Sequence, residues 1–83
     1  MNESDLKPQF DSAKSYYGKA KVYRDGDREV LRSYSTDVAE VRDGKAKVFG
    51  TYSATTLRHI KEFLKQRGFK AETKTQILRD YGD

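Results

Sequence analysis

The chain has 83 residues, of which 35 % are apolar, 36 % charged and 12 % aromatic, so we expect one small domain with a modest core. The absence of cysteine excludes disulfides and cysteine-ligated metal sites, and a single histidine excludes a histidine-rich metal site. The net charge of +4 permits binding to nucleic acid and does not require it.

Neither a secretion signal nor a membrane segment is predicted. The first ten residues are polar and acidic and lack the apolar stretch of a secretion signal. No run approaches the roughly 18 apolar residues that indicate a spanning helix. The absence of cysteine fits a reducing compartment, so we expect a cytoplasmic location.

Residues 1–13 are predicted to form a flexible N-terminal arm, because they are mostly polar, with Leu6 and Phe10 as isolated apolar residues. Residues 14–83 are predicted to form a single α+β domain. Its first half alternates polar and apolar residues between turn signals, which is typical of half-buried strands. Four strands are expected, at residues 19–23, 29–34, 37–42 and 45–52.

The four strands are expected to pair as two hairpins, because Asp25-Gly26 and Asp43-Gly44 are hairpin turn signals. The sequence around these turns repeats after 18 residues: Arg-Asp-Gly is followed each time by an apolar pair, a hydroxyl residue, Tyr and Ser. The word Gly-Lys-Ala-Lys-Val also occurs twice, from Gly18 and from Gly44. The alternative is a chance recurrence of short strand and turn words.

The main helix is predicted to follow the strands. Ser53 is a good N-cap, and Gly68 suits the left-handed position after the last turn, with Phe69 folding back onto Leu64. The apolar stripe of this helix consists of Leu57, Ile60, Phe63 and Leu64. A second helix is expected at residues 74–81, with Thr73 and Gln76 at capping-box spacing and Ile77, Leu78 and Tyr81 on its apolar side.

These elements predict an α+β fold, in which a four-stranded antiparallel sheet of two hairpins packs on one main helix, with a short C-terminal helix. The main helix is expected to bury one face of the sheet, which leaves the other face open to water or to a partner. The oligomeric state stays open, because free strand edges can pair.

No residue pattern indicates catalysis, and we expect no enzymatic activity, cofactor or metal. His59 is expected on a polar, solvated side of the main helix, so no nucleophile has an evident base. Glu72-Thr73-Lys74 resembles the Glu-x-Lys of metal-dependent nucleases, but no preceding acidic ligand is identifiable. Asp25, Asp27 and Glu29 lack the spacing of a calcium loop and are interpreted as a charged hairpin tip.

Two basic surfaces are predicted to bind a partner. On the sheet, lysines alternate with aromatic rings, a combination that holds phosphate and stacks bases; the alternative is that the lysines protect edge strands and the rings pack inward. On the helix, basic residues at i, i+3 and i+7 track a phosphate backbone; the alternative is a solvated outer face. The sheet residues are Lys19, Lys21, Tyr23, Lys45, Lys47, Phe49 and Thr51, and the helix residues are Thr55, Thr56, Arg58, His59, Lys61 and Lys65.

Several stretches resemble a domain of unknown function found in small proteins of Gram-positive phages and their plasmids. They are Lys14-Ser15-Tyr16-Tyr17-Gly18-Lys19-Ala20, then Ser33-Tyr34-Ser35-Thr36 with Val38-Ala39, then Tyr52-Ser53-x-Thr55-Thr56-x-Arg58-His59-Ile60-Lys61-Glu62-Phe63-Leu64, and finally Gly68-Phe69. The resemblance covers about residues 14–69. It implies a mobile-element origin and a functional patch at Thr55, Thr56, Arg58 and His59, without implying an activity.

We therefore expect a non-enzymatic accessory protein of a phage or mobile element, located in the host cytoplasm, that binds nucleic acid or a nucleoprotein complex. The alternative is a protein-binding inhibitor of a host defence system, of the anti-CRISPR type, which acts by occupying a host complex. Neither a membrane nor a small-molecule substrate is expected as a partner. The sequence does not distinguish DNA, RNA and protein partners.

Overall fold

The computed structural model describes residues 2–50 and 52–82 and has an α+β fold, as expected. Within these residues the sheet has five strands rather than the expected four. The elements are β1 (Asn2–Asp5), β2 (Ala20–Asp25), β3 (Arg28–Ser33), β4 (Thr36–Arg42), β5 (Lys45–Val48), α1 (Ala54–Gln66) and α2 (Lys74–Tyr81). The four expected strands correspond to β2–β5, and both helices occur where the capping signals place them.

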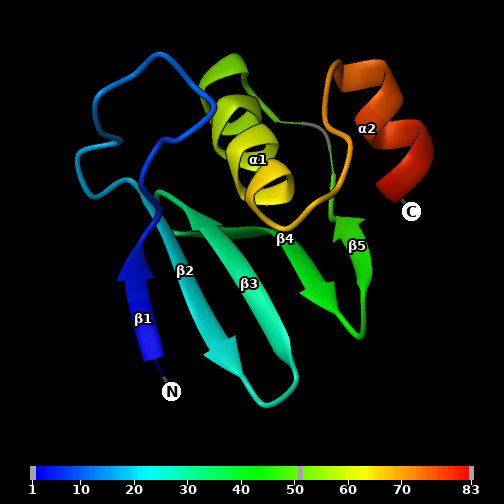
Figure 1. Cartoon of the computed structure of the whole chain (residues 1–83), viewed down its shortest axis with the longest axis horizontal. Helices are drawn as coiled ribbons and strands as arrows, with labels where there is room; N and C mark the ends of the chain where they lie inside the picture. The colour runs from blue at the N-terminus through cyan, green and yellow to red at the C-terminus, as the bar shows by residue number, and fades with distance from the viewer. Residues whose placement is uncertain (1, 51, 83) are drawn as a thin grey trace.

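The sheet is an antiparallel meander in the order β1-β2-β3-β4-β5, so each strand pairs with its neighbour in sequence. Both helices lie on the same face of the sheet, with α2 beside β5 (Figure 1). Neither helix in the described part of the chain is long and apolar enough to cross a membrane. The fold thus has two layers, and one broad sheet face is left without a covering element.

The N-terminal segment is part of the sheet, which corrects the prediction of an arm outside the fold. Strand β1 pairs antiparallel with β2, and the Leu6 amide continues the ladder by donating to the Ala20 carbonyl at 2.9 Å. The Leu6 side chain is buried in the core. Farther along, the amides of Phe10 and Asp11 both donate to the carboxylate of Glu62 on α1 at 2.9 Å. Met1 lies outside the described residues.

The core lies between the inner face of the sheet and the two helices. Alternate residues of the strands point into it, and α1 contributes its expected stripe, with Leu57 only partly buried. A register shift in β4 places Val38 and Ala39, which are consecutive in sequence, both in the core. The fully buried members of the core are Ala20, Leu31, Val38, Ala39, Val48, Ile60, Phe63, Leu64, Ala71 and Ile77.

Local signals fix both ends of α1 as predicted. The Ser53 hydroxyl accepts from the Thr56 amide at the N-terminus. At the C-terminus Gly68 has a φ of +84°, and the Phe69 amide donates to the Leu64 carbonyl at 3.0 Å. This is the Schellman arrangement, in which a left-handed residue reverses the chain. Thr73 caps α2 in the same way by accepting from the Gln76 amide.

The two hairpins form as expected, and each turn has two residues. Relative to the repeated Arg-Asp-Gly sequence, however, the first turn begins one residue later than the second. Asp25 pairs with Arg28, so Gly26 is the first residue of the first turn, whereas Gly44 is the second residue of the turn after β4. A shift of one residue moves every side chain to the opposite face of a strand. Val30 therefore points away from the core, and its counterpart Val48 points into it. The predicted fourth strand is also shorter than expected, because β5 ends at Val48.

If the N-terminal segment is part of the fold, Leu6→Ala will destabilise the protein by about 2 kcal/mol or more, the usual cost of emptying a buried leucine site. The neighbouring exposed residue provides the control, because Lys7→Ala removes no buried side chain. The measurement is the free energy of unfolding in urea for both variants. Equal unfolding midpoints for the two variants and the wild type would return this segment to the status of an independent arm.

Candidate functional site

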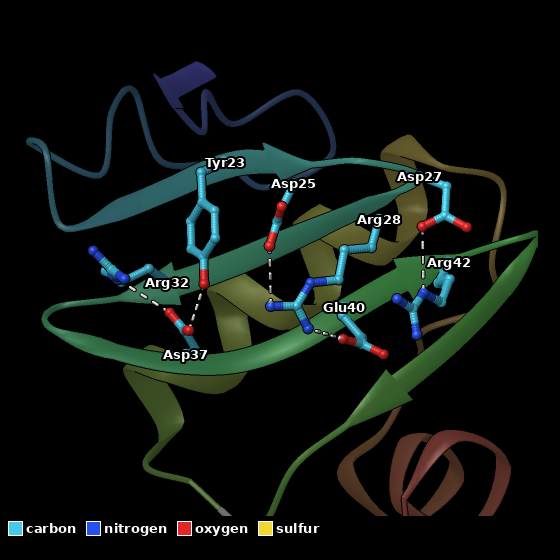
Figure 2. Close-up of polar contacts among 8 residues, drawn as sticks. All are labelled: Tyr23, Asp25, Asp27, Arg28, Arg32, Asp37, Glu40 and Arg42. Atoms are coloured by element: carbon cyan, nitrogen blue, oxygen red, sulfur yellow. Dashed lines mark hydrogen bonds and ion pairs between the residues drawn. The ribbon is translucent and has the colours of Figure 1, made fainter. Parts of the chain in front are cut away.

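The sheet face that points away from the helices carries paired charges, several of which Figure 2 shows. Tyr23 donates its hydroxyl proton to Asp37, and Arg32 Nε donates to the other carboxylate oxygen at 3.0 Å. The Arg32 guanidinium also lies over the Tyr23 ring, 5.0 Å from its centroid. Burial opposes the charge of Asp37, but the hydrogen bonds from Tyr23 and Arg32 hold its pKa below the usual value. Tyr23 is thus only 8 % exposed and is part of a structural network.

The charged hairpin tip contributes further ion pairs to the same face. Arg28 Nη1 lies 3.0 Å from a carboxylate oxygen of Glu40, and its Nη2 lies 3.8 Å from Asp25. Arg42 Nε lies 3.4 Å from Asp27 on the turn between β2 and β3, as Figure 2 shows. Within residues 2–50 and 52–82, no three potential metal-ligating side chains form a group that could hold an ion. Asp25 and Asp27 at this tip thus pair with arginines across the strands, whereas Glu29 accepts from Arg67 Nη2 at the end of α1 at 3.0 Å.

The expected lysine and aromatic surface on the sheet is only partly formed. Lys21 lies 3.4 Å from Asp5 and 3.9 Å from Glu3 on β1 and stays partly exposed. The Tyr23 ring is covered, which corrects the prediction of an exposed ring at this position. The other predicted sheet residues are placed as follows: Lys19, Lys45 and Lys47 are exposed, Phe49 is half-buried, and Thr51 lies outside the described residues. Acidic and basic side chains alternate here, so this face lacks the uniform positive charge that favours duplex binding.

On α1, the predicted site residues Thr56 and His59 are buried, which corrects the expectation of a solvated histidine. His59 is 2 % exposed, and its Nδ1 lies 2.8 Å from the Ser33 hydroxyl oxygen. The same hydroxyl lies 3.1 Å from Thr56 Oγ1. The Tyr16 ring packs against the imidazole in a T-shaped contact, with ring centroids 4.5 Å apart. Ser33 on the sheet thus provides a hydrogen-bond partner for Thr56 and His59, so these polar side chains of α1 can be buried. The periodicity of the helix alone does not reveal this partner.

The Ser33–His59 pair has the separation of a nucleophile and its base, but both groups lie inside the protein. Burial lowers the pKa of His59 and the nearby Arg58 cation lowers it further, whereas the Asp11 carboxylate acts in the opposite direction. The imidazole is therefore mainly neutral at pH 7. We interpret the pair as a structural hydrogen bond between the helix and the sheet.

The remaining helix residues lie on the side of α1 that faces residues 10–12. Arg58 forms a bidentate pair with Asp11, with distances of 2.8 Å from Nη2 and 3.1 Å from Nε. The hydrogen bonds from Arg58, and to a smaller extent from Tyr16, hold the pKa of Asp11 far below its usual value despite desolvation. Lys61 and Lys65 are partly exposed on the same side, and Thr55 is exposed. The predicted basic stripe is thus present, with its first member neutralised by Asp11.

Two strongly exposed tyrosine rings lie on loops, and the sequence analysis did not select either of them as a site residue. Tyr17 is 78 % exposed and Tyr34 is 53 % exposed. The Tyr34 amide donates to the Lys19 carbonyl at 2.7 Å, and Lys19 Nζ lies over the Tyr34 ring, 5.7 Å from its centroid. We call Tyr17, Lys19 and Tyr34 the tyrosine–lysine surface. It combines exposed aromatic faces with a positive charge.

Both tyrosines hold a left-handed backbone, with φ angles of 54° at Tyr17 and 59° at Tyr34. This conformation costs a residue with a side chain roughly 1 kcal/mol, whereas glycine adopts it freely. Neither exposed ring belongs to the apolar core, although the Tyr34 ring lies in a tilted contact with the buried His59, with ring centroids 6.1 Å apart. Strained residues of this kind gather at binding sites. The dipeptide Tyr17-Gly18 is a turn signal that indicates an exposed tyrosine in a loop, whereas strand alternation indicates only the neighbouring lysines.

Comparison with known families gives a match to one family model. The model is described as a family of unknown function (DUF8033), and it matches residues 4–79. The match begins within β1 and ends within α2, so it spans the sheet and both helices. No curated protein and no solved structure matches the chain. The function must therefore be argued from the geometry of the chain itself.

The buried His59 predicts a specific loss of stability in mild acid. Its pKa is lower in the folded protein than in the unfolded chain, so the unfolded chain takes up a proton first as the pH falls below 6.5. The free energy of unfolding should therefore decrease between pH 7 and pH 5. The carboxylate of Asp11 contributes little in this window, because its stabilising effect is lost only as the pH falls through its ordinary pKa of 3.8 and below.

The test is urea unfolding of the wild type and of His59→Gln across this pH range. The variant keeps a polar side chain but removes the titration, so its stability should change less with pH. A wild-type stability that stays flat from pH 7 to pH 5, or an equal slope in the variant, contradicts the assignment of a buried neutral imidazole.

Proposed function

We propose that this chain, which belongs to the family of unknown function DUF8033, binds an unpaired nucleic-acid strand, alone or within a nucleoprotein complex, in a non-catalytic role. The observation that carries the proposal is the exposed Tyr34 ring with Lys19 Nζ 5.7 Å from its centroid, together with the exposed Tyr17 ring two residues before Lys19 in the chain. Unstacked bases bind to such rings by stacking, and a neighbouring lysine attracts the phosphate. The net charge of +4 supports the approach of a polyanion.

The structure favours a single strand over a duplex as the ligand. Stacking on Tyr17 and Tyr34 requires bases that have left their own stack, as in a loop or an unpaired strand. Duplex binding would instead require a positive surface that follows two phosphate backbones. The broad open face of the sheet carries alternating charges that already pair with one another, such as Arg28 with Glu40. The tyrosine–lysine surface is therefore the better candidate contact.

The exposed tyrosines also support a second candidate, a protein-binding inhibitor of a host defence complex. Tyrosine and arginine are the residues that most often dominate the energy of protein interfaces. Under this reading Tyr17 and Tyr34 enter pockets of a partner protein. The mobile-element origin on which this candidate depends stays a prediction from the resemblance.

Tyr17→Ala and Tyr34→Ala should each weaken binding to single-stranded oligonucleotides by about tenfold, because base stacking on an aromatic ring contributes roughly 1–3 kcal/mol. Lys19→Ala should weaken binding less and should reduce its dependence on salt. Lys74→Ala is the control, since it removes an exposed lysine on α2. The measurement is fluorescence anisotropy with labelled DNA and RNA strands at several salt concentrations.

Absence of binding by the wild type at micromolar protein, or unchanged affinity in the Tyr17→Ala/Tyr34→Ala double variant, contradicts the nucleic-acid proposal. The second candidate requires a protein partner that the wild type retains from nuclease-treated host lysate and that the double variant loses. The two proposals therefore make different predictions for the same pair of proteins.

A further inference from the structure

An open hollow of about 380 Å³ lies between α1 and the segment of residues 10–12. Helix α1 contributes Arg58, Lys61 and Lys65 to its lining, and the opposite segment contributes Phe10 and Asp11. The volume falls within the range of about 300–1,000 Å³ that is typical of small-molecule sites. The size and the side chains of this hollow therefore suit a small charged ligand.

The wall opposite the helix is fixed by a buried carboxylate. Glu62 Oε1 accepts from the amides of Phe10 and Asp11, and its Oε2 accepts from Gln66 Nε2 at 2.6 Å. Gln66 Nε2 also donates to the Lys7 carbonyl at 2.7 Å, which adds a contact to the same segment. The hollow thus exists before any ligand binds, which lowers the entropic cost of binding.

The charged side chains of the lining that remain available to a ligand are positive. The Glu62 carboxylate is held by three N–H donors, and the Asp11 carboxylate is paired with Arg58. By contrast, Lys61 and Lys65 form no ion pair with a carboxylate in the described part of the chain. These two lysines are spaced i, i+4 and therefore lie on one side of the helix. An anion that enters the hollow meets two available ammonium groups.

Phe10 gives the hollow a second property. Its side chain is 60 % exposed although its backbone is fixed by Glu62. An exposed ring beside two lysines can stack a planar heterocycle while the lysines hold a negatively charged group. The ligand chemistry that matches both features is a base linked to a phosphate.

We infer that this hollow binds a nucleoside monophosphate, with the phosphate between Lys61 and Lys65 and the base on Phe10. The ligand is either a free nucleotide or the 5′-phosphorylated end of a strand, since the two share this chemistry. The inference does not depend on the tyrosine–lysine surface, because it uses none of the residues of that surface.

The experiment is an NMR titration of the 15N-labelled full chain with adenosine 5′-monophosphate, adenosine and inorganic phosphate. The monophosphate should shift the amides of residues 10–12 and 58–65 at lower concentration than either fragment does. Lys61→Ala/Lys65→Ala should weaken its binding by about tenfold or more, the loss of two charge-assisted contacts. Phe10→Ala should remove the advantage of the monophosphate over inorganic phosphate.

Lys70→Ala/Lys74→Ala is the matched control, because it removes two exposed lysines beside α2 without changing the hollow. Equal binding of adenosine and its monophosphate, or unchanged binding in Lys61→Ala/Lys65→Ala, overturns the inference. The Tyr17→Ala/Tyr34→Ala variant should still bind the monophosphate, so failure of the strand-binding proposal is seen separately. In that variant, we compare the amide chemical shifts on adding an oligonucleotide with a 5′-phosphate and the same oligonucleotide with a 5′-hydroxyl. If only the phosphorylated form changes the shifts, the ligand is a strand end. If only the free monophosphate changes them, the ligand is a free nucleotide.

Discussion

The buried carboxylate of Glu62 is the interaction on which the N-terminal third of this structure depends. An ionisable group inside a protein is costly unless it is fully hydrogen-bonded, and here two backbone amides and a glutamine side chain supply the donors. Those amides belong to Phe10 and Asp11, so satisfying the carboxylate fixes the course of the preceding chain. Asp11, once fixed, accepts from Arg58 and from the Tyr16 hydroxyl. The Tyr16 ring in turn packs on His59, which is hydrogen-bonded to Ser33. The loop of residues 10–16, helix α1 and strand β3 are thus connected by one series of polar and ring contacts.

The sequence predicted those parts of the fold that local rules determine. The caps at Ser53 and Thr73 and the reversal at Gly68 act within a few residues, so composition and spacing identify them. It did not predict strand β1, because a short polar edge strand has no alternation to detect and its pairing depends on β2. The burial of His59 escaped detection for the same reason, since its partner Ser33 is 26 residues away. Local signals thus located the elements, and contacts distant in sequence decided which side chains are buried.

The site was predicted less well than the fold, and the hairpins show why. The two Arg-Asp-Gly words look alike, yet a turn shifted by one residue gives Val30 and Val48 opposite facings. Lys21, predicted as part of a binding surface, pairs with acidic residues of β1, a strand that the sequence analysis did not predict. Exposure of a side chain is a property of its neighbours in space. Residue type and alternation therefore identified candidate side chains without establishing which of them are free to contact a partner.

The meander order of the sheet has a consequence for how the chain acquires its structure. Between β2 and β5 every connection is a turn of two residues, so these strands meet with little loss of loop entropy. Such low contact order is associated with fast folding. The exception is the link from β1 to β2, which must close residues 6–19 before the edge strand can pair. The segment that forms one wall of the nucleotide-sized hollow therefore belongs to the pairing with the largest entropic cost, and it should open and close more readily than the central hairpins.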